Sequence, residues 1–326
     1  MTSSAAATTA PSRNTAARVR GLLRHEAVLA VLLVVLLLVA GRMSPDFVAP
    51  GTQAELLSHV WETALLALPM TLLILTGGID LSVGSTMALS AVVFGLAFRA
   101  GLGPVVGSLL ALGTGALAGA LNGLFVARVR VHPLIVTLAT LAAFRGIAEG
   151  ISLARPVSNF PASFTGPLGG GALPAALFVV AALLAAFVLA RTPLGLFLRA
   201  IGHNETACRF SGVPVDRIKF GLYTLSGFAA GVAALLFVAR RNTAKADIGQ
   251  GIELDVVTMV VLGGTSIFGG RGTILGTMLG VLLVHETREW VRWQFNRDEL
   301  NLIVLGALLI ASVLLHRLFS SKDRSA

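Results

Sequence analysis

The segment LTGGIDLSVGS, Leu75–Ser85, separates two long uncharged runs and carries a carboxylate, Asp80, between glycines. Each flanking run, Thr63–Ile79 and Leu81–Phe98, is about as long as a membrane-spanning helix needs to be. A carboxylate at the centre of a bilayer costs at least ~2.5–3.5 kcal/mol, so Asp80 needs a hydrogen-bond donor or a wet cavity. The paired glycines weaken the helix, and Asp80 can accept from the freed backbone N–H of Ser82 or Val83. The segment therefore predicts a helix that is broken inside the membrane.

The composition of the whole chain agrees with a membrane protein. Of its 326 residues, 55% are hydrophobic and 13% charged, with a mean hydropathy of +0.85; soluble domains have roughly 25% charged residues. The net charge is +9, but the basic residues stand at the ends of apolar runs and are not interleaved with aromatics on one face. This distribution indicates membrane topology and no nucleic acid. A single cysteine, Cys208, excludes an internal disulfide.

About ten apolar segments are candidate spans, which predicts an all-α, polytopic membrane protein with some short or broken helices. The first starts at Ala27 and has no convincing cleavage site before Met43, so we expect an uncleaved span instead of a signal peptide. The others are Thr63–Ile79, Leu81–Phe98, Ala100–Ala127, Val131–Phe144, Leu173–Ala190, Phe220–Ala239, Val256–Gly270, Gly272–Val284 and Leu300–Leu315.

The basic residues set the expected orientation, because Lys and Arg accumulate on the cytoplasmic side. Alternating from an inside N-terminus places most of them in the cytoplasm, so both termini are expected there. We expect a disordered cytoplasmic tail over residues 1–26, a transmembrane domain over 27–318 and a second cytoplasmic tail over 319–326. Arg240, Arg241 and Lys245 fall on the outer side and count against this arrangement.

The longest polar insertion, residues 191–219, is expected in the cytoplasm. Within it, Asn204 can cap a short helix that begins at Glu205 and stops at Gly212, with Pro214 just beyond. A short capped helix in a cytoplasmic loop is a candidate docking element.

Two glycine patterns indicate an internal repeat. GGIDLSVG (Gly77–Gly84) and GGTSIFGG (Gly263–Gly270) share Gly-Gly-x5-Gly, and transporters are often built from repeats whose interrupted helices meet at the membrane midplane. The candidate translocation-pathway residues are Gly77, Gly78, Asp80, Ser82, Gly84, Ser85, Gly263, Gly264 and Gly270.

Two alternatives stay open for these polar residues. Asp80 either contacts the solute or only holds the break in shape. Ser82, Ser85, Thr86 and Ser90 lie on one arc of a helix, where they line a hydrated pathway or simply bond to their own helix.

The remaining patterns speak for architecture and against enzymatic chemistry. Two rows of small residues, Gly115/Gly119/Gly123 and Gly272/Gly276/Gly280, predict tight helix crossings. No nucleophile–base pair, metal-ligand cluster or nucleotide-binding Gly-x4-Gly-Lys-Ser/Thr is present, so we expect no catalytic residue, no metal and no cofactor. Any ATP must be handled by a partner.

Three blocks together carry a resemblance to a known family: ILTGGIDLSVGSTMAL (Ile74–Leu89), AIGHNETACRFSGV (Ala200–Val213) and ELDVVTMVVLGGTSIFGGRGTILGT (Glu253–Thr277). They resemble the membrane permease subunits of bacterial ATP-binding-cassette (ABC) importers for monosaccharides, of the ribose, xylose and rhamnose type, which are related to branched-chain amino acid permeases. In that family the middle block is a coupling helix that seats in a groove of the ATP-hydrolysing subunit. The resemblance carries this role to Gly202, Asn204, Glu205, Ala207 and Gly212. Cys208 stands where the family usually has a second alanine.

The resemblance also implies partners and a location. These are ABC ATPase subunits, a soluble sugar-binding protein outside, and a second permease subunit, identical or paralogous, in a bacterial inner membrane. An ion-coupled secondary transporter is the alternative, but it needs intramembrane ionisable residues, and only Asp80 and the Arg145/Glu149 pair are candidates. An ABC permease for a nucleoside or an amino acid is a further alternative, and the sequence does not name the solute.

Overall fold

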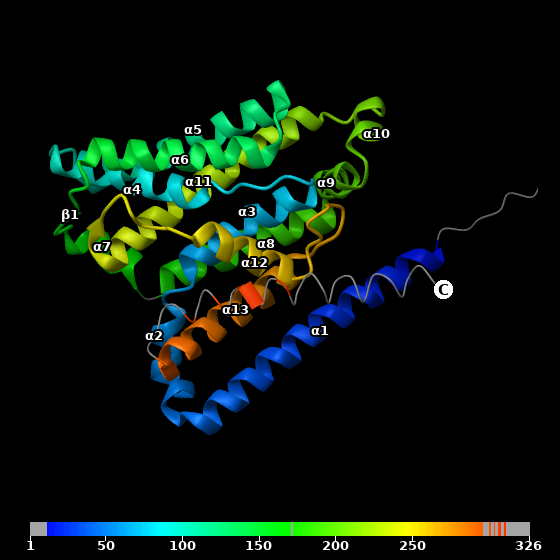
Figure 1. Ribbon diagram of the computed structural model, residues 1–326, viewed down its shortest axis with the longest axis horizontal. Helices are drawn as coiled ribbons and strands as arrows, with labels where there is room; N and C mark the ends of the chain where they lie inside the picture. The colour runs from blue at the N-terminus through cyan, green and yellow to red at the C-terminus, as the bar shows by residue number, and fades with distance from the viewer. Residues whose placement is uncertain are drawn as a thin grey trace, which may run out of the picture.

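The computed structural model describes residues 12–170 and 172–295, together with residues 300, 303, 306, 307 and 310. The described part is an all-α bundle with one two-stranded antiparallel pairing of β1 and β2 (Figure 1). The helices and strands of the first half are α1 (Ser12–Met43), η1 (Pro45–Val48), α2 (Pro50–Leu57), α3 (Trp61–Leu75), α4 (Val83–Arg99), α5 (Gly103–Gly123), η2 (Leu124–Val129) and α6 (Pro133–Ser152). Those of the second half are β1 (Val157–Ser158), α7 (Ala162–Gly169), α8 (Ala172–Arg191), α9 (Pro193–His203), α10 (Glu205–Phe210), α11 (Val215–Arg241), β2 (Thr243–Ala244), α12 (Ile252–Leu262) and α13 (Ile274–Phe295).

Each predicted apolar segment before residue 295 contains a helix, although the run Val256–Gly270 is helical only as far as Leu262. Among the described residues, 5 helices are long and apolar enough to cross a membrane alone, or up to 6 when α2 and α3, which meet at 54°, count as one span. The chain is therefore a multi-pass membrane protein. The tenth expected span, Leu300–Leu315, lies largely outside the described residues, as does the tail 319–326.

The N-terminal segment differs from expectation. α1 begins at Ser12, inside the segment predicted as a disordered tail to residue 26, and residues 1–11 lie outside the described part. The difference has a simple origin, because alanine, leucine and arginine dominate this stretch and are all strong helix formers.

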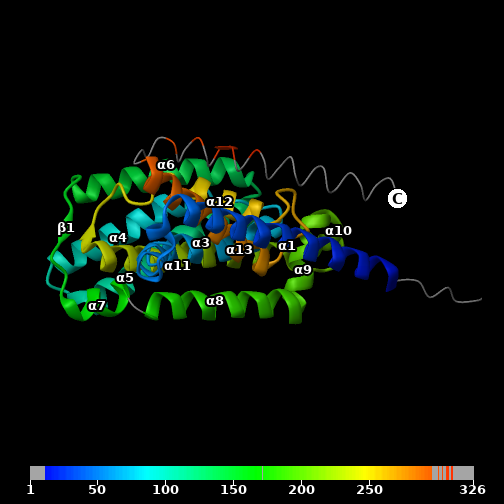
Figure 2. The same cartoon turned by 90° about the horizontal axis from the view of Figure 1, so that it is seen from below.

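The centre of the bundle is built from α3, α4, α11 and α12. α3 is apolar on every side, and Leu66, Met70 and Leu73 are completely buried, as expected of a helix enclosed by other helices. The outer helices instead keep apolar faces exposed: Val34 is 54% exposed, and Leu109 and Leu183 are each 65% exposed. Figure 2 shows α6 and α8 on opposite sides of the central helices. These apolar outer faces suit lipid contact.

Close helix crossings depend on the two predicted rows of glycines. A β-carbon on Gly119 of α5 would clash with the carbonyl oxygen of Tyr223 on α11, and one on Gly280 of α13 would clash with the carbonyl oxygen of Met259 on α12. Since no larger residue fits at these positions, the prediction of tight crossings is confirmed.

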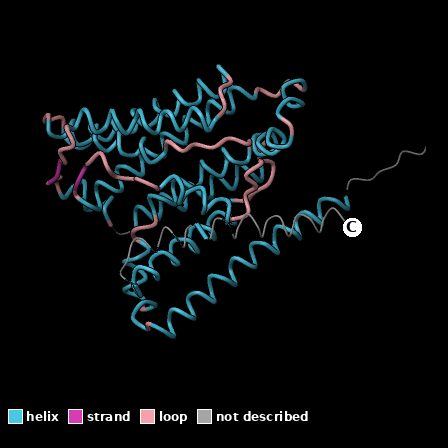
Figure 3. Tube along the Cα trace, viewed as in Figure 1, coloured by secondary structure: helices cyan, strands magenta, loops and turns pink. Residues whose placement is uncertain are grey.

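Two short helices, α4 and α12, start inside the bundle. α4 has 17 residues and α12 has 11, so at 1.5 Å per residue they extend only ~26 Å and ~16 Å. The non-helical segment 76–82 leads into α4 and runs through the interior between α11 and α3 (Figures 1 and 3). A second non-helical segment, 245–251, leads into α12. The predicted helix break is therefore present inside the bundle.

The two matching glycine segments occupy matching places in the chain. Gly77–Gly84 lies between α3 and α4, and Gly263–Gly270 lies between α12 and α13; Gly77 and Gly264, just after the preceding helices, have φ of +74° and +89°. The internal repeat itself stays a prediction. A β-carbon on Gly84 would clash with the carbonyl oxygen of Gly249, so the two short helices begin side by side.

Candidate functional site

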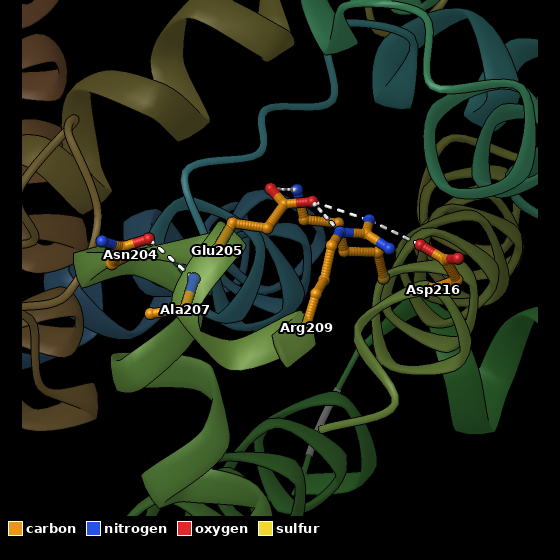
Figure 4. Close-up of polar contacts among 6 residues, drawn as sticks. Asn204, Glu205, Ala207, Arg209 and Asp216 are labelled. Carbon is orange, nitrogen blue, oxygen red and sulfur yellow. Dashed lines mark hydrogen bonds and ion pairs between the residues drawn. The ribbon is translucent and has the colours of Figure 1, made fainter. Parts of the chain in front are cut away.

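The polar insertion, residues 191–219, contains an arm of two short helices, α9 and α10, which projects from one end of the bundle (Figure 1). Asn204 separates them: its backbone is extended, and its side-chain oxygen accepts a hydrogen bond from the backbone N–H of Ala207 at 2.9 Å. This is the N-cap that the sequence predicts, and it is confirmed (Figure 4). α10 ends at Phe210, and Gly212 follows with φ +80°, which reverses the chain at the end of the helix.

A compact ion network fixes α10 to the start of α11. Glu205 accepts from Lys219 Nζ at 2.5 Å and from Arg209 Nη2 at 2.8 Å, and Arg209 also pairs with Asp216 at 2.6 Å (Figure 4). Partial burial alone would raise the pKa of the Glu205 carboxyl, but the hydrogen bonds from Lys219 and Arg209 outweigh it and hold the pKa below its ordinary value. The contacts of Arg209 with Asp216 and Glu205 raise the pKa of its guanidinium. The network therefore stays charged at neutral pH.

The two faces of α10 differ. Cys208 is buried and packs with Ile201 and Val215, so the thiol that replaces the family's alanine faces the protein itself. Phe210 lies on the other side and is 89% exposed, while Thr206 and Ala207 are also exposed. An exposed aromatic at the tip of a rigid arm is typical of a protein contact.

At its base the arm touches both glycine-rich segments. A β-carbon on Gly202, in the last turn of α9, would clash with the carbonyl oxygen of Leu75 and with the backbone nitrogen of Gly270. Those two atoms are joined by a hydrogen bond of 2.9 Å. Gly269 lies against Gly77 in the same place. Three backbones meet here because their side chains are absent, so the structure brings Gly77, Gly202 and Gly270 together.

Asp80 lies in the first break and is 1% exposed. One carboxylate oxygen accepts from the backbone N–H and hydroxyl of Ser82 at 3.0 and 2.7 Å, and the other accepts from the Ser226 hydroxyl at 2.8 Å. The predicted bond to the Ser82 N–H is therefore confirmed. The break is held further by Tyr223, whose hydroxyl donates to the carbonyl oxygen of Ile79 at 3.1 Å. Both carboxylate oxygens of Asp80 therefore accept hydrogen bonds that hold the segment in shape and against α11.

The predicted arc of hydroxyls is buried. Ser82 accepts a hydrogen bond from Asn122 at 2.8 Å, and Ser85 donates to the carbonyl oxygen of Ser82 at 2.9 Å. Ser90 is also buried, and its hydroxyl has no partner within the described part of the chain. The contact of Ser85 favours the alternative in which a hydroxyl bonds to its own helix, whereas Ser82 bonds to Asp80 within the break and to Asn122 on α5.

The other candidate pathway residues separate into two places. Gly77 and Gly78 begin the break, and Gly84 lies against the start of α12. Gly263, Gly264 and Gly270 lie in the α12–α13 turn next to the base of the arm.

Arg240, at the opposite end of the bundle from the arm, has a local explanation. Its Nη2 pairs with the buried Glu62 at 2.8 Å, and its Nε donates to the same oxygen at 2.9 Å. Because Glu62 neutralises this cation inside the protein, Arg240 counts less against the predicted orientation than a free loop arginine would.

Sequence reasoning missed the partners of the key residues. Lys219 binds Glu205, and Ser226 and Tyr223 bind the break from within an apolar run, but their sequence surroundings announce none of these contacts. Only Arg209 offered a signal, since it stands four residues after Glu205 on the predicted helix.

This geometry, with broken helices inside a membrane bundle and a capped arm at one end, defines a transport permease. The family model for the branched-chain amino acid transport system / permease component matches residues 54–313. The chain belongs to this family.

Relatives with assigned roles agree. The chain is 35% identical over 291 residues to the ribose import permease protein of Bacillus subtilis (strain 168), covering 87% of this chain and 90% of the relative. It is 37% identical over 268 residues to the autoinducer 2 import system permease protein of Yersinia pseudotuberculosis (serotype O:3, strain YPIII), covering 78% and 80%. No solved structure matches the chain.

Proposed function

We propose that the chain is the transmembrane subunit of an ABC importer that moves a monosaccharide across the bacterial inner membrane. A soluble binding protein delivers the sugar, and a partner subunit hydrolyses the ATP. One observation supports this mechanism: Gly202, in the last turn of α9, packs directly against the backbone of Leu75, where the break that holds Asp80 begins.

The tip of the arm is the proposed seat for the ATPase. Phe210 supplies an apolar anchor that is 89% exposed, and the Glu205 network fixes the direction in which it points. Asn204 and Ala207 contribute through the cap that starts α10, and Gly212 contributes through the chain reversal that ends it. The proposed coupling residues therefore shape the helix, and the contact itself falls to Phe210 and its exposed neighbours.

The base of the arm is the proposed transmission point. When ATP binding draws the ATPases together, α9 moves with α10, and Gly202 presses on Leu75 and Gly270 at once. Leu75 ends α3 and begins the route to Asp80, while Gly270 leads into α13. A displacement of the arm thus reaches both segments through contacts between backbone atoms, where no side-chain rotation can absorb the movement.

The partner set follows from the same proposal. A second permease, identical or paralogous, and two ATPases complete the assembly, and the binding protein docks at the end opposite the arm. The two named relatives make ribose and autoinducer 2 the first solutes to test.

Reconstitution in lipid vesicles tests the function. The chain, co-expressed with a candidate ABC ATPase and supplied with a candidate binding protein from the same genome, should take up radiolabelled ribose or autoinducer 2 only with ATP inside and binding protein outside. Collapse of ion gradients should leave uptake unchanged. Uptake that stops when the gradients collapse, and ignores ATP, would instead establish an ion-coupled transporter.

A further inference from the structure

A group of polar residues lies outside the features described so far, on the face formed by α6 and the segment 245–251. We call it the polar wall and define it as Arg145, Glu149, Asp247, Gln250 and Glu253. Glu149, Asp247 and Gln250 are exposed, and Arg145 and Glu253 are partly exposed.

The inner side of this segment is anchored to the bundle. Arg145 on α6 donates from Nη1 to the backbone carbonyl oxygens of Ala246 at 2.5 Å and Ile248 at 2.7 Å. The carbonyl of Gly249 lies against Gly84 at the start of α4. The segment is therefore a fixed structural element, with one side bound to protein and the other side open.

The depth of the segment follows from the length of α12. The turn after α12 contacts Gly202 at the base of the arm, so the end of α12 lies at the cytoplasmic end of the bundle. α12 has 11 residues, which at 1.5 Å each places its start ~16 Å away, about half of a ~30 Å hydrocarbon core. Gln250 and Glu253 flank that start and hence lie near the middle of the membrane.

Such a surface does not suit lipid. Non-helical backbone at membrane depth is tolerated only where it is buried in protein or lines a water-filled cavity, and ionisable residues at that depth follow the same rule. The outward side of residues 247–251 is not buried by the described part of this chain, since Asp247, Gln250 and Gly251 are exposed there. In the proposed assembly the remaining neighbours are the second permease subunit and the water between the two subunits.

We infer that the polar wall lines the water-filled conduit through which the solute passes. The inference deepens the proposed function, because it gives the pathway a surface on this chain other than the buried Asp80 segment. Asp80 holds the break in place, and the wall meets the solute.

The chemistry of the wall indicates the class of solute. Carboxylates, an amide and a guanidinium can each hydrogen-bond to hydroxyl groups, and three carboxylates against one guanidinium disfavour an anionic solute. The wall has no aromatic residue on which a sugar ring could stack. It therefore suits weak, transient contact with a neutral polyhydroxylated solute.

Cysteine accessibility tests the water-filled face. In a Cys208→Ala background, Gln250→Cys and the lipid-facing control Leu183→Cys are treated with a membrane-impermeant methanethiosulfonate in lipid vesicles. Leu183 is 65% exposed near the middle of α8, so it matches Gln250 in depth and exposure and differs in its neighbours. We expect Gln250→Cys to react about tenfold faster or more, because the reagent requires the hydrated thiolate. Equal, slow reaction at both positions would overturn the inference.

A second measurement separates the solute conduit from any other wet crevice. Trapping the assembled importer with ATP and vanadate should change the reaction rate at Gln250→Cys severalfold, while Arg241→Cys, exposed at the outer end, reacts unchanged. A wet position whose rate ignores the trap, in an assembly that does hold the trapped nucleotide, would refute the assignment to the pathway. Failure of the proposed ABC function alone would look different, because vanadate would then trap no nucleotide while the labelling contrast with Leu183→Cys persisted.

Discussion

The backbone amide of Gly270 donates to the carbonyl oxygen of Leu75 at 2.9 Å, tying the turn before α13 to the end of α3. Gly202 lies against both atoms so closely that no β-carbon fits. This contact links the arm to two segments that are almost two hundred residues apart in the chain, and it makes the strongest prediction.

Gly202→Ala should separate ATP hydrolysis from transport. The added methyl forces the arm away from Leu75 and Gly270, a strain of about 1–3 kcal/mol, while the exposed tip around Phe210 stays unchanged. We expect the ATPase to co-purify normally and ATP-driven uptake to fall at least severalfold, with more ATP hydrolysed per solute moved.

The matched control is Gly221→Ala on α11, where an added β-carbon meets no atom within 4 Å. It should transport as the unchanged protein does. If Gly202→Ala and Gly221→Ala transported equally well, the arm would not act through this junction.

Glu205→Gln should weaken the association with the ATPase. The substitution removes the charge that holds both Lys219 and Arg209, so the direction of α10 is no longer fixed. We expect less ATPase to co-purify, and Glu205→Arg to be worse because it adds a third cation to the cluster. Asp46→Asn, an exposed carboxylate at the other end of the bundle, is the control and should change nothing.

Lowering the pH should not imitate that substitution within the neutral range. The pKa of Glu205 lies below its ordinary value of 4.5, so the stabilisation by its two cations is complete above that value and is lost only as the pH falls through the lower folded-state pKa. Co-purification that is equal at pH 8 and pH 6 is expected. A loss already at pH 6 would show that another group controls the contact.

Asn204→Ala should loosen α10 without unfolding the protein. The N-cap bond to Ala207 is worth about 1 kcal/mol, which is a large share of the stability of so short a helix. Hydrogen exchange over residues 205–212 should become faster, and Asn204→Asp, which keeps an acceptor, should restore protection. Exchange that is equally slow in Asn204→Ala would mean that the ion network alone holds α10.

α6 carries a third row of small residues, Ala142, Gly146 and Gly150, on an exposed face. A β-carbon on Gly146 or Gly150 would meet no atom within 4 Å, whereas the other two rows are used for crossings within the chain. Such rows allow close approach of another helix. In a Cys208→Ala background, Gly146→Cys should form a cross-link between two permease subunits under oxidation, and Val34→Cys on the lipid-facing side of α1 should not. The reverse result would place the second subunit elsewhere.

The sequence predicts the local features well, because they depend on neighbouring residues. Apolar runs mark the long helices up to residue 295, whereas α2, α7 and α9 lie outside them, and Asn204, Glu205 and Gly212 mark the ends of α10 through side-chain capping and a left-handed turn. The bond from Ser82 to Asp80 spans two residues, so it too could be predicted.

Features that depend on distant residues could not be predicted. Glu62 neutralises Arg240 from 178 positions away, and nothing near either residue announces the pair. The segment 245–251 contains Lys245, Asp247 and Gln250, which are typical of an ordinary exposed loop. The sequence therefore gives no indication of the depth that we infer for this segment.

The role of Asp80 can be decided by a double-mutant cycle with Ser226, which reaches its carboxylate from α11 at 2.8 Å. If Asp80 holds the break, then Asp80→Asn and Ser226→Ala should each lower the melting temperature, and the double variant should lose less than their sum, with a coupling energy of about 1–3 kcal/mol. Ser90→Ala is the control, because that buried hydroxyl makes no hydrogen bond in the described part of the chain. A contact with solute would act differently. Asp80→Asn would then reduce uptake, but the melting temperature would not change and the coupling energy with Ser226 would be close to zero. Since both carboxylate oxygens already accept hydrogen bonds inside the protein, we expect the first result.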